Sequence, residues 1–363
     1  MQDELLNTQD RLTRRRGFAR WALIATLLAA VVVMLGAWTR LVDAGLGCPD
    51  WPGCYGFLHV PQTPAQIAIA EARFPEAPVD VAKGWPEMIH RYFAGSLGLV
   101  ILGMTVFAIR HRREALPVRH CIGLLALVTL QAAFGMWTVT LQLWPQIVAT
   151  HLLGGFATLS LLFLLALRMS AHHPPLPILA EQRLLRLRPW LWLSLLLVIA
   201  QIALGAWTAA NYAAVACTDV PGCHGALWPE MDVRHGFDIF QQIGPNYLGG
   251  QLESDGRVAI HMFHRAGALV VLVVCGLVLG LMLRATAHTP LAGWLLLTGL
   301  VLLAQIGLGI ANVVLHLPLA IAVAHNAVGA ALLLCLINLI YRVHRLRAPA
   351  RRPTVVPLQE VRA

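Results

Sequence analysis

Eight apolar runs, each near the roughly 20 residues that an α-helix needs to cross a bilayer, constrain this chain more than any other feature. They lie at residues 18–39, 89–109, 120–141, 147–167, 190–212, 258–283, 291–315 and 319–341. Only 12% of the 363 residues are charged, which is about half the share of a typical soluble domain. The sequence therefore predicts an all-α membrane protein with eight transmembrane helices. The first run is too long for a signal peptide, so we expect a retained helix.

The distribution of positive charge predicts an orientation. The two tails and the loops at 110–119, 168–189 and 284–290, counted together with the adjoining span ends, hold 20 of the 27 Lys and Arg residues. By the positive-inside rule, both termini are expected in the cytoplasm. The expected location is the inner (plasma) membrane. The long loops at 41–88 and 213–257 are then extracytoplasmic. The net charge of +9 is explained by this orientation, and no nucleic-acid partner is expected.

An internal repeat divides the chain into two halves. The segment Leu35–Thr39 returns as Leu204–Thr208, and Cys48–Cys54 returns as Cys217–Cys223, both at an offset of 169 residues. Because each half has four spans, the repeat is parallel, and the expected architecture is two four-helix bundles. The expected divisions are a cytoplasmic tail at 1–17, an N-terminal bundle at 18–168, a cytoplasmic linker at 169–189, a C-terminal bundle at 190–342 and a cytoplasmic tail at 343–363.

Four histidines recur near the outer ends of their spans. His90 and His151 return as His264 and His325, each displaced by 174 residues. Ionisable side chains are costly inside a bilayer, so two matched pairs indicate a ligand. Two imidazoles on facing helices can approach a haem iron from opposite faces. The alternative for any one of them is an interfacial histidine bonded to a carbonyl.

Other metals fit this pattern less well. Zinc prefers four protein ligands, and each half offers two well-placed histidines. A copper site would use Met or Cys at the same level, and Met88 and Met262 lie near that level. Copper is therefore kept as a minor alternative.

A finer pattern marks the first and third spans of each half. Gly36, Gly135, Gly205 and Gly309 are each followed three residues later by Thr or Asn, and three of the four are preceded by Gln at four residues. Small residues of this kind indicate tight helix packing, with polar side chains bonding across helices. The functional interpretation is a close approach of a flat macrocycle to the backbone.

The two halves differ at Glu87. This residue stands three before His90 on the same helix face, whereas the matching residue of the second half is His261. The difference suggests that one site holds a permanent cofactor and the other carries out the chemistry. The alternative is an ordinary carboxylate near a helix N-terminus. Arg91 and Arg265 follow the first histidine of each pair, either as snorkelling residues or as partners of haem propionates.

The outer cysteines fit an oxidising compartment. Cys48 and Cys54, and likewise Cys217 and Cys223, are spaced for short-loop disulfides in the extracytoplasmic loops. A structural role and a redox-active role both remain open.

Taken together, these features resemble the haem A synthase family over about residues 18–342. The resemblance rests on the parallel repeat, the Glu87–Arg91 and Phe263–Arg265 segments, His151, His325 and the Cys48–Cys54 loop. It implies oxidation of the C8 methyl group of haem O to the formyl group of haem A. The reaction proceeds by two successive hydroxylations and loss of water, for the biogenesis of haem-copper oxidases.

The resemblance also implies roles for individual residues. His264 and His325 would ligate haem b as the cofactor, while His90 and His151 present the substrate haem O beside a catalytic Glu87. Arg91 would help to bind the substrate haem, and Arg265 would help to bind the haem b. The implied partners are the lipid bilayer, a haem O synthase (protohaem farnesyltransferase), an electron donor and further copies of the chain in a homo-oligomer.

Two other classes of protein share part of the pattern. A bis-histidine dihaem cytochrome b would use the same four histidines for electron transfer without a chemical product. A parallel-repeat transporter would need helices broken near the midplane, and Gly or Pro interruptions of that kind are not evident.

Overall fold

The computed structural model describes residues 2–114, 116–170 and 176–346. Most of the predicted C-terminal tail, at 347–363, and residues 171–175 of the predicted linker lie outside the described residues. Within the described ranges the chain is almost entirely helical. The helices long enough to cross a membrane are α1 (Gln2–Leu41), α3 (Val81–Arg110), α4 (Val118–Thr140), α5 (Pro145–Ser170), α6 (Ile178–Ala210), α8 (Ser254–Thr286), α9 (Pro290–Val314) and α10 (Leu319–His344).

The remaining elements are short and connect the long helices. They are α2 (Pro64–Arg73), η1 (Arg112–Glu114), η2 (Ala213–Val215) and α7 (Val233–Gly236). Eight of the helices in the described residues have the length and apolar composition of membrane spans, so the predicted class, an all-α multi-pass membrane protein, is confirmed. Many of their leucines are exposed, among them Leu99 at 70% and Leu300 at 65%. Apolar surface of this extent is expected where lipid surrounds the protein.

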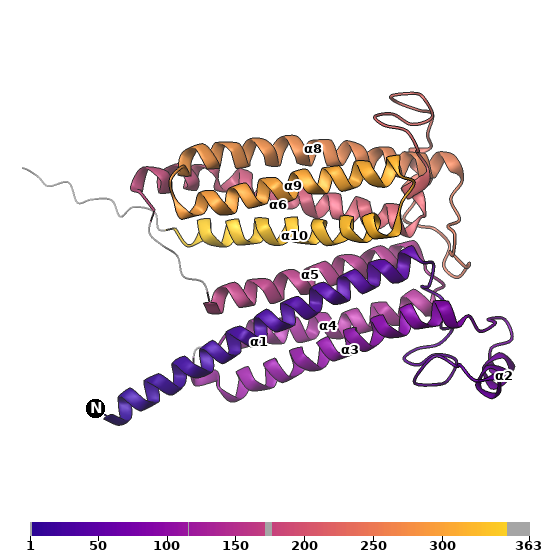
Figure 1. The fold of residues 1–363 in the computed structure, drawn as a ribbon, viewed down its shortest axis with the longest axis horizontal. Helices are drawn as coiled ribbons and strands as arrows, with labels where there is room; N and C mark the ends of the chain where they lie inside the picture. The colour runs from indigo at the N-terminus through magenta and orange to yellow at the C-terminus, as the bar shows by residue number, and fades with distance from the viewer. Residues whose placement is uncertain (1, 115, 171–175, 347–363) are drawn as a thin grey trace, which may run out of the picture.

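The long helices form two groups, which Figure 1 shows one above the other. In the first group, α1 and α4 each contact both α3 and α5. In the second, α6 and α9 each contact both α8 and α10. The N-terminal half therefore places α3 opposite α5, and the C-terminal half places α8 opposite α10. The two halves meet where α1 and α5 pack against α6 and α10.

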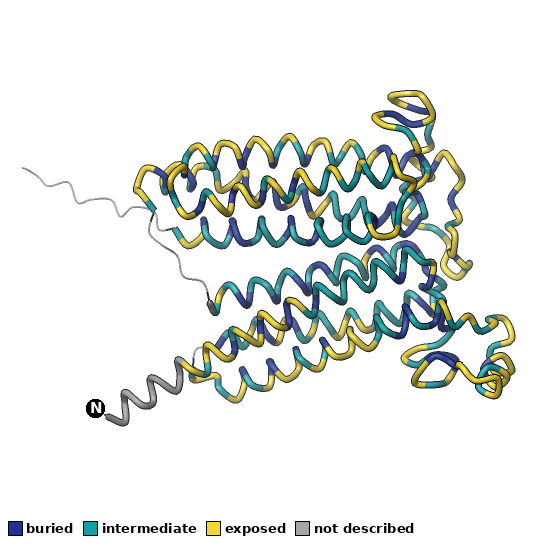
Figure 2. Tube along the Cα trace, in the orientation of Figure 1, coloured by how far each residue is buried: buried dark blue, intermediate teal, exposed yellow. Residues whose placement is uncertain are grey.

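The buried core follows from this arrangement. One hydrophobic cluster runs through both halves and includes Phe18, Met104, Leu191 and Leu336. Buried and half-buried residues line the contacts between helices, while exposed residues lie on the outer faces and in the long loops (Figure 2). The long loops, at 42–80 and 211–253, lie at one end of the molecule, called here the loop end.

Helix boundaries differ from the sequence predictions at three places. Residues from Gln2 onward in the predicted tail at 1–17 belong to α1, and residues 178–189 of the predicted linker belong to α6. In that part of α6, Ala180 and Leu184 are buried while Arg183 and Arg186 are exposed, so the helix is amphipathic. Its polar face lowers the mean hydropathy, which explains why a search for apolar runs places the start of this helix too late.

The third difference concerns the starts of α3 and α8, and it places His90 and His264 deeper inside these helices. The apolar runs predicted helix starts at residues 89 and 258, whereas α3 begins at Val81 and α8 at Ser254. The side chain of Asp80 caps α3 by accepting a hydrogen bond from the Lys83 N–H at 3.1 Å, which satisfies one of the free backbone donors of a helix start. His90 consequently lies nine residues into α3, or about 13 Å along its axis.

Candidate haem-binding sites

Each of the four histidines packs its ring against a glycine of a neighbouring helix. A Cβ added at the glycine would lie 3.0–3.4 Å from the ring carbon Cε1 in every case. The contacts are Gly36 with His90, Gly135 with His151, Gly205 with His264 and Gly309 with His325. The glycines in the predicted pattern therefore serve close helix packing, and a larger residue would push the imidazole aside.

The glycines also fix the depth of the histidines. Each lies five residues before the end of its helix, α1, α4, α6 or α9, at the loop end. His90 on α3 and His151 on α5 therefore approach one level from opposite corners of the N-terminal half. His264 on α8 and His325 on α10 do the same in the C-terminal half. The structure thus pairs the histidines as the sequence predicted.

The environment of these rings fits residues that would hold a haem iron. The Nδ1 atoms of His90, His151 and His325 are buried and have no hydrogen-bond partner among the described residues. The same rings lie beside backbone carbonyls of the neighbouring helix, at Val32, Gln131 and Gln305 respectively. A metal-ligating histidine characteristically uses one ring nitrogen for such an outer contact and keeps the other for the metal.

The number of ligands also suits haem. Among the described residues no group of three or more His, Cys, Asp or Glu side chains gathers as a metal site. Two imidazoles suffice for haem because the macrocycle supplies the other four ligands. A copper site would use Met88 and Met262. These two residues instead pack with the disulfides in two small loop clusters.

Glu87 is buried and has two partners in the N-terminal half. The residue is 4% exposed, although a lone buried carboxylate is costly. One carboxylate oxygen, Oε2, accepts a hydrogen bond from the Cys48 N–H at 3.0 Å. The other, Oε1, forms an ion pair with the Arg91 guanidinium. The carboxylate is therefore fixed in orientation between a loop and its own helix.

Arg91 and Arg265 share a role that sequence reasoning missed. The Arg91 guanidinium donates to the carbonyls of Asp50, at 2.9 Å, and Gly53. The Arg265 guanidinium donates to the carbonyls of Asp219, at 2.8 Å, and Gly222. Each arginine therefore holds the repeated cysteine loop against its helix. The sequence did contain a signal for this role, because in both halves of the repeat a cysteine loop precedes the first histidine and an arginine follows it.

The two cysteine loops have the same construction. Disulfides join Cys48 to Cys54 and Cys217 to Cys223, as the sequence predicted. Asp50 accepts hydrogen bonds from the N–H groups of Tyr55 and Gly56, at 2.6 and 2.8 Å.

Asp219 does the same in the second loop. It accepts from His224 and Gly225 at 2.8 and 2.9 Å, and the N–H groups of Gly225 and His224 lower the pKa of Asp219.

The first loop is docked closely on its helix. A Cβ at Gly47 would lie 2.3 Å from the Lys83 carbonyl oxygen, and one at Gly84 would lie 2.8 Å from Val60. Burial raises the pKa of the Tyr55 phenol in this loop, and its hydroxyl donates to the Pro78 carbonyl at 3.0 Å. The close contact brings the Cys48 N–H to Glu87.

The second half lacks this carboxylate arrangement. His261, at the position that matches Glu87, is 4% exposed and its Nδ1 has no partner. Its ring lies beside the backbone of Ala213. Arg265, without a carboxylate to pair with, donates instead to the Cys217 carbonyl at 3.1 Å. The asymmetry seen in the sequence is therefore also an asymmetry of contacts.

Thr39 is a further residue whose role the sequence did not reveal. Its hydroxyl lies 3.1 Å from the carbonyl oxygen of Pro86, the residue before Glu87. Thr208, its counterpart in the second half, bonds only to the Leu204 carbonyl of its own helix, at 2.8 Å. The repeated motif pointed to this position but not to the difference between the halves.

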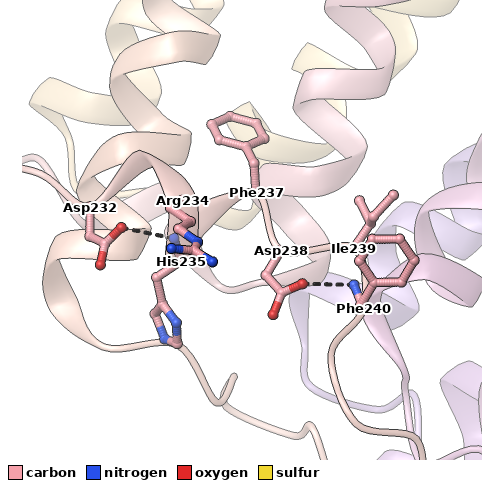
Figure 3. A pocket seen from close by; sticks show the side chains of 7 residues that line it. All are labelled: Asp232, Arg234, His235, Phe237, Asp238, Ile239 and Phe240. Carbon is pink, nitrogen blue, oxygen red and sulfur yellow. Dashed lines mark hydrogen bonds between the residues drawn. The ribbon is translucent and has the colours of Figure 1, made fainter.

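The second outer loop reaches across to the N-terminal half. The Tyr247 N–H donates to the Gln142 carbonyl at 3.0 Å, and the Gln146 amide donates to the Ile239 carbonyl at 2.8 Å. Figure 3 shows a surface depression in this segment, lined by residues from Asp232 to Phe240. The carboxylates of Asp232 and Asp238 there accept backbone hydrogen bonds within the segment. The segment therefore links the loop ends of the halves, and none of the four paired histidines lines its depression.

Comparison with known proteins agrees with this geometry. Residues 19–337 match the model of a family described as cytochrome oxidase assembly protein. A haem A synthase from Shewanella oneidensis is 43% identical over 323 residues, covering 88% of this chain and 95% of that protein. A haem A synthase from a Caulobacter species is 31% identical, covering 92% and 98% of the two chains. One from a Chelativorans species is 29% identical, covering 88% and 89%.

Proposed function

The chain belongs to the haem A synthase family, and on that premise we propose how its two halves divide the reaction. Haem A synthases oxidise a methyl group of haem O to the formyl group of haem A, and this chain is an oxidoreductase of that kind. We infer that the N-terminal half binds haem O through His90 and His151. The C-terminal half then holds haem b through His264 and His325. The supporting observation is that both halves have opposed histidines, while Glu87 is present in one only.

The C-terminal half suits a resident cofactor. Haem b supplies one-electron redox chemistry that amino-acid side chains lack. In this proposal His264 and His325 hold its iron from opposite corners of the bundle. The Nε–H of Arg265 is buried and has no partner within the described part of the chain, so this donor could bond to a haem propionate. At the position that matches Glu87, the second half has His261 and therefore no carboxylate.

The N-terminal half suits the chemistry. His90 and His151 would orient haem O, and Glu87 would handle protons beside it. The Arg91 guanidinium stabilises the ionised carboxylate, which can then accept a proton from a hydroxylated methyl group. The Cys48 N–H and Arg91 fix the direction of that carboxylate. Glu87 is thus proposed as the catalytic residue, and Arg91 and Thr39 as residues that position it.

The same proposal includes the cellular setting. The excess of Lys and Arg in the tails and in one set of loops supports cytoplasmic termini in the inner membrane, with the loop end extracytoplasmic. A haem O synthase would supply the substrate, and an electron donor would serve the C-terminal half. Assembly as a homo-oligomer remains part of the proposal.

Conversion of haem O in cells tests the function. We expect that producing the chain in cells that make haem O, but have no haem A synthase of their own, yields haem A in extracted pigments. Cells carrying the empty vector should contain haem O and haem b only. An electron-transfer cytochrome b would bind haem without changing the pigments. Haem O alone in both cell types, with the chain present in the membrane, would contradict the proposal.

A further inference from the structure

Glutamine side chains support histidines of both pairs. The Gln131 amide nitrogen donates to the carbonyl oxygen of His151 at 2.8 Å. The Gln201 amide nitrogen donates to the carbonyl oxygen of His264 at 2.8 Å and lies 3.0 Å from the ring Nδ1 of the same residue. Each glutamine comes from a neighbouring helix, α4 or α6. Gln131 therefore fixes the backbone of its histidine, and Gln201 fixes both the backbone and the ring.

The fourth span of the C-terminal half repeats the arrangement. The Gln305 amide nitrogen on α9 lies 3.3 Å from the ring Nε2 of His325 on α10. Three of the four paired histidines therefore have a glutamine partner. In each case the glutamine stands four residues before the glycine that contacts the ring.

A second glycine on each histidine helix makes room for the glutamine. A Cβ at Gly154 would lie 2.5 Å from the Gln131 Oε1, and one at Gly267 would lie 2.2 Å from the Gln201 Oε1. At Gly329 it would lie 3.2 Å from the Gln305 amide nitrogen. These glycines follow their histidines by three or four residues. The glutamine and the glycine therefore form one packing unit.

His90 lacks both parts of this unit. The residue four before Gly36 is Val32, and the residues three and four after His90 are Phe93 and Ala94. The ring lies against Gly36 and beside the Val32 carbonyl, and its Nδ1 is buried with no partner. No side chain in the described residues donates a hydrogen bond to it. His90 thus lacks the glutamine partner that its three counterparts have.

We propose that the glutamine–glycine units determine how firmly each half retains its haem, and that His90 is the exchangeable ligand. The inference rests on the proposed division of the halves. A resident haem must stay bound through many turnovers, whereas a substrate haem must enter and its product must leave. Partners of a metal-ligating histidine typically change metal affinity by about 10- to 100-fold. Val32 would therefore weaken retention in the N-terminal half, while Gln201 and Gln305 act as positioning residues for the haem b.

Haem transfer to a scavenger tests this proposal. The purified full-length protein is loaded with haem b in both halves and mixed with excess apomyoglobin, and the transfer is followed by absorbance. We expect two phases, a fast one from the N-terminal half and a slow one from the C-terminal half. Val32→Gln combined with Ala94→Gly installs the missing unit and should slow the fast phase about 10-fold. The slow phase should not change, which also shows that the variant is folded.

The matched variants reverse the change. Gln305→Val should accelerate the slow phase about 10-fold and leave the fast phase unaltered, and Gln131→Val should accelerate only the fast phase. If the double variant does not fold, these two single variants carry the test. If the rates of both transfer phases are unchanged in folded variants, the proposal is wrong, even if the parent chain makes haem A. If the parent chain shows the two expected transfer phases but makes no haem A, the proposed function is wrong and the proposal about haem retention still stands.

Discussion

Replacing His264 or His325 by alanine is expected to remove nearly all haem b from the purified protein. In the proposal each variant would lose one of the two imidazoles that hold the haem b iron, and only one histidine of the pair would remain. The loss should exceed the roughly 10- to 100-fold effect of changing an outer partner of a ligating histidine. The reduced-minus-oxidised absorbance spectrum, normalised to protein concentration, measures the effect.

The control uses the same helix as His325. His344 lies at the other end of α10 and is exposed, so His344→Ala should keep the spectrum of the parent protein. If both paired-histidine variants purify as folded protein with an unaltered spectrum, the C-terminal half does not hold haem b through these residues.

Glu87→Gln should lower the conversion of haem O to haem A by about 100-fold or more, the usual range for loss of a general acid or base. The amide can still accept the Cys48 hydrogen bond, but it removes the charge that pairs with Arg91. Accumulation of the singly hydroxylated haem is expected if the second oxidation depends more on the carboxylate. Chromatography of haems extracted from cells that make haem O measures each species.

The matching position in the repeat provides the control. His261→Glu adds a carboxylate to the C-terminal half and should have a smaller effect on haem A formation. The haem b spectrum of Glu87→Gln should equal that of the parent, because the altered residue lies in the other half. Normal haem A production by Glu87→Gln would exclude a catalytic role for this residue.

Much of the architecture could be predicted because it depends on local physical rules. A span of about 20 apolar residues can satisfy its backbone inside lipid only as a helix, so the eight helices follow from composition. The offset that relates His90 to His264 also implied that the halves are built alike. The glycines beside the histidines, such as Gly36 and Gly205, were visible as a pattern before their contacts were known.

Other features depend on contacts that a single sequence does not encode locally. The amphipathic start of α6 contains several arginines, so its mean hydropathy is too low for a search for apolar runs to include it. The loop partners of Arg91 are backbone carbonyls, which carry no residue-specific signal, so the sequence suggested snorkelling or a haem propionate instead. The hydrogen bond between Glu87 and the Cys48 N–H requires a loop folded back across 39 residues. Loop conformations of this kind are set by tertiary contacts.

The identity of the haems bound to the purified parent protein tests the central claim most directly. The protein would be isolated from cells that make both haem b and haem O, and its extracted pigments separated by chromatography with mass detection. Two functionally different halves predict haem b together with a comparable amount of farnesylated haem, as haem O, its hydroxylated form or haem A. Haem b alone, at about two per chain, would contradict the account and would identify a dihaem electron carrier.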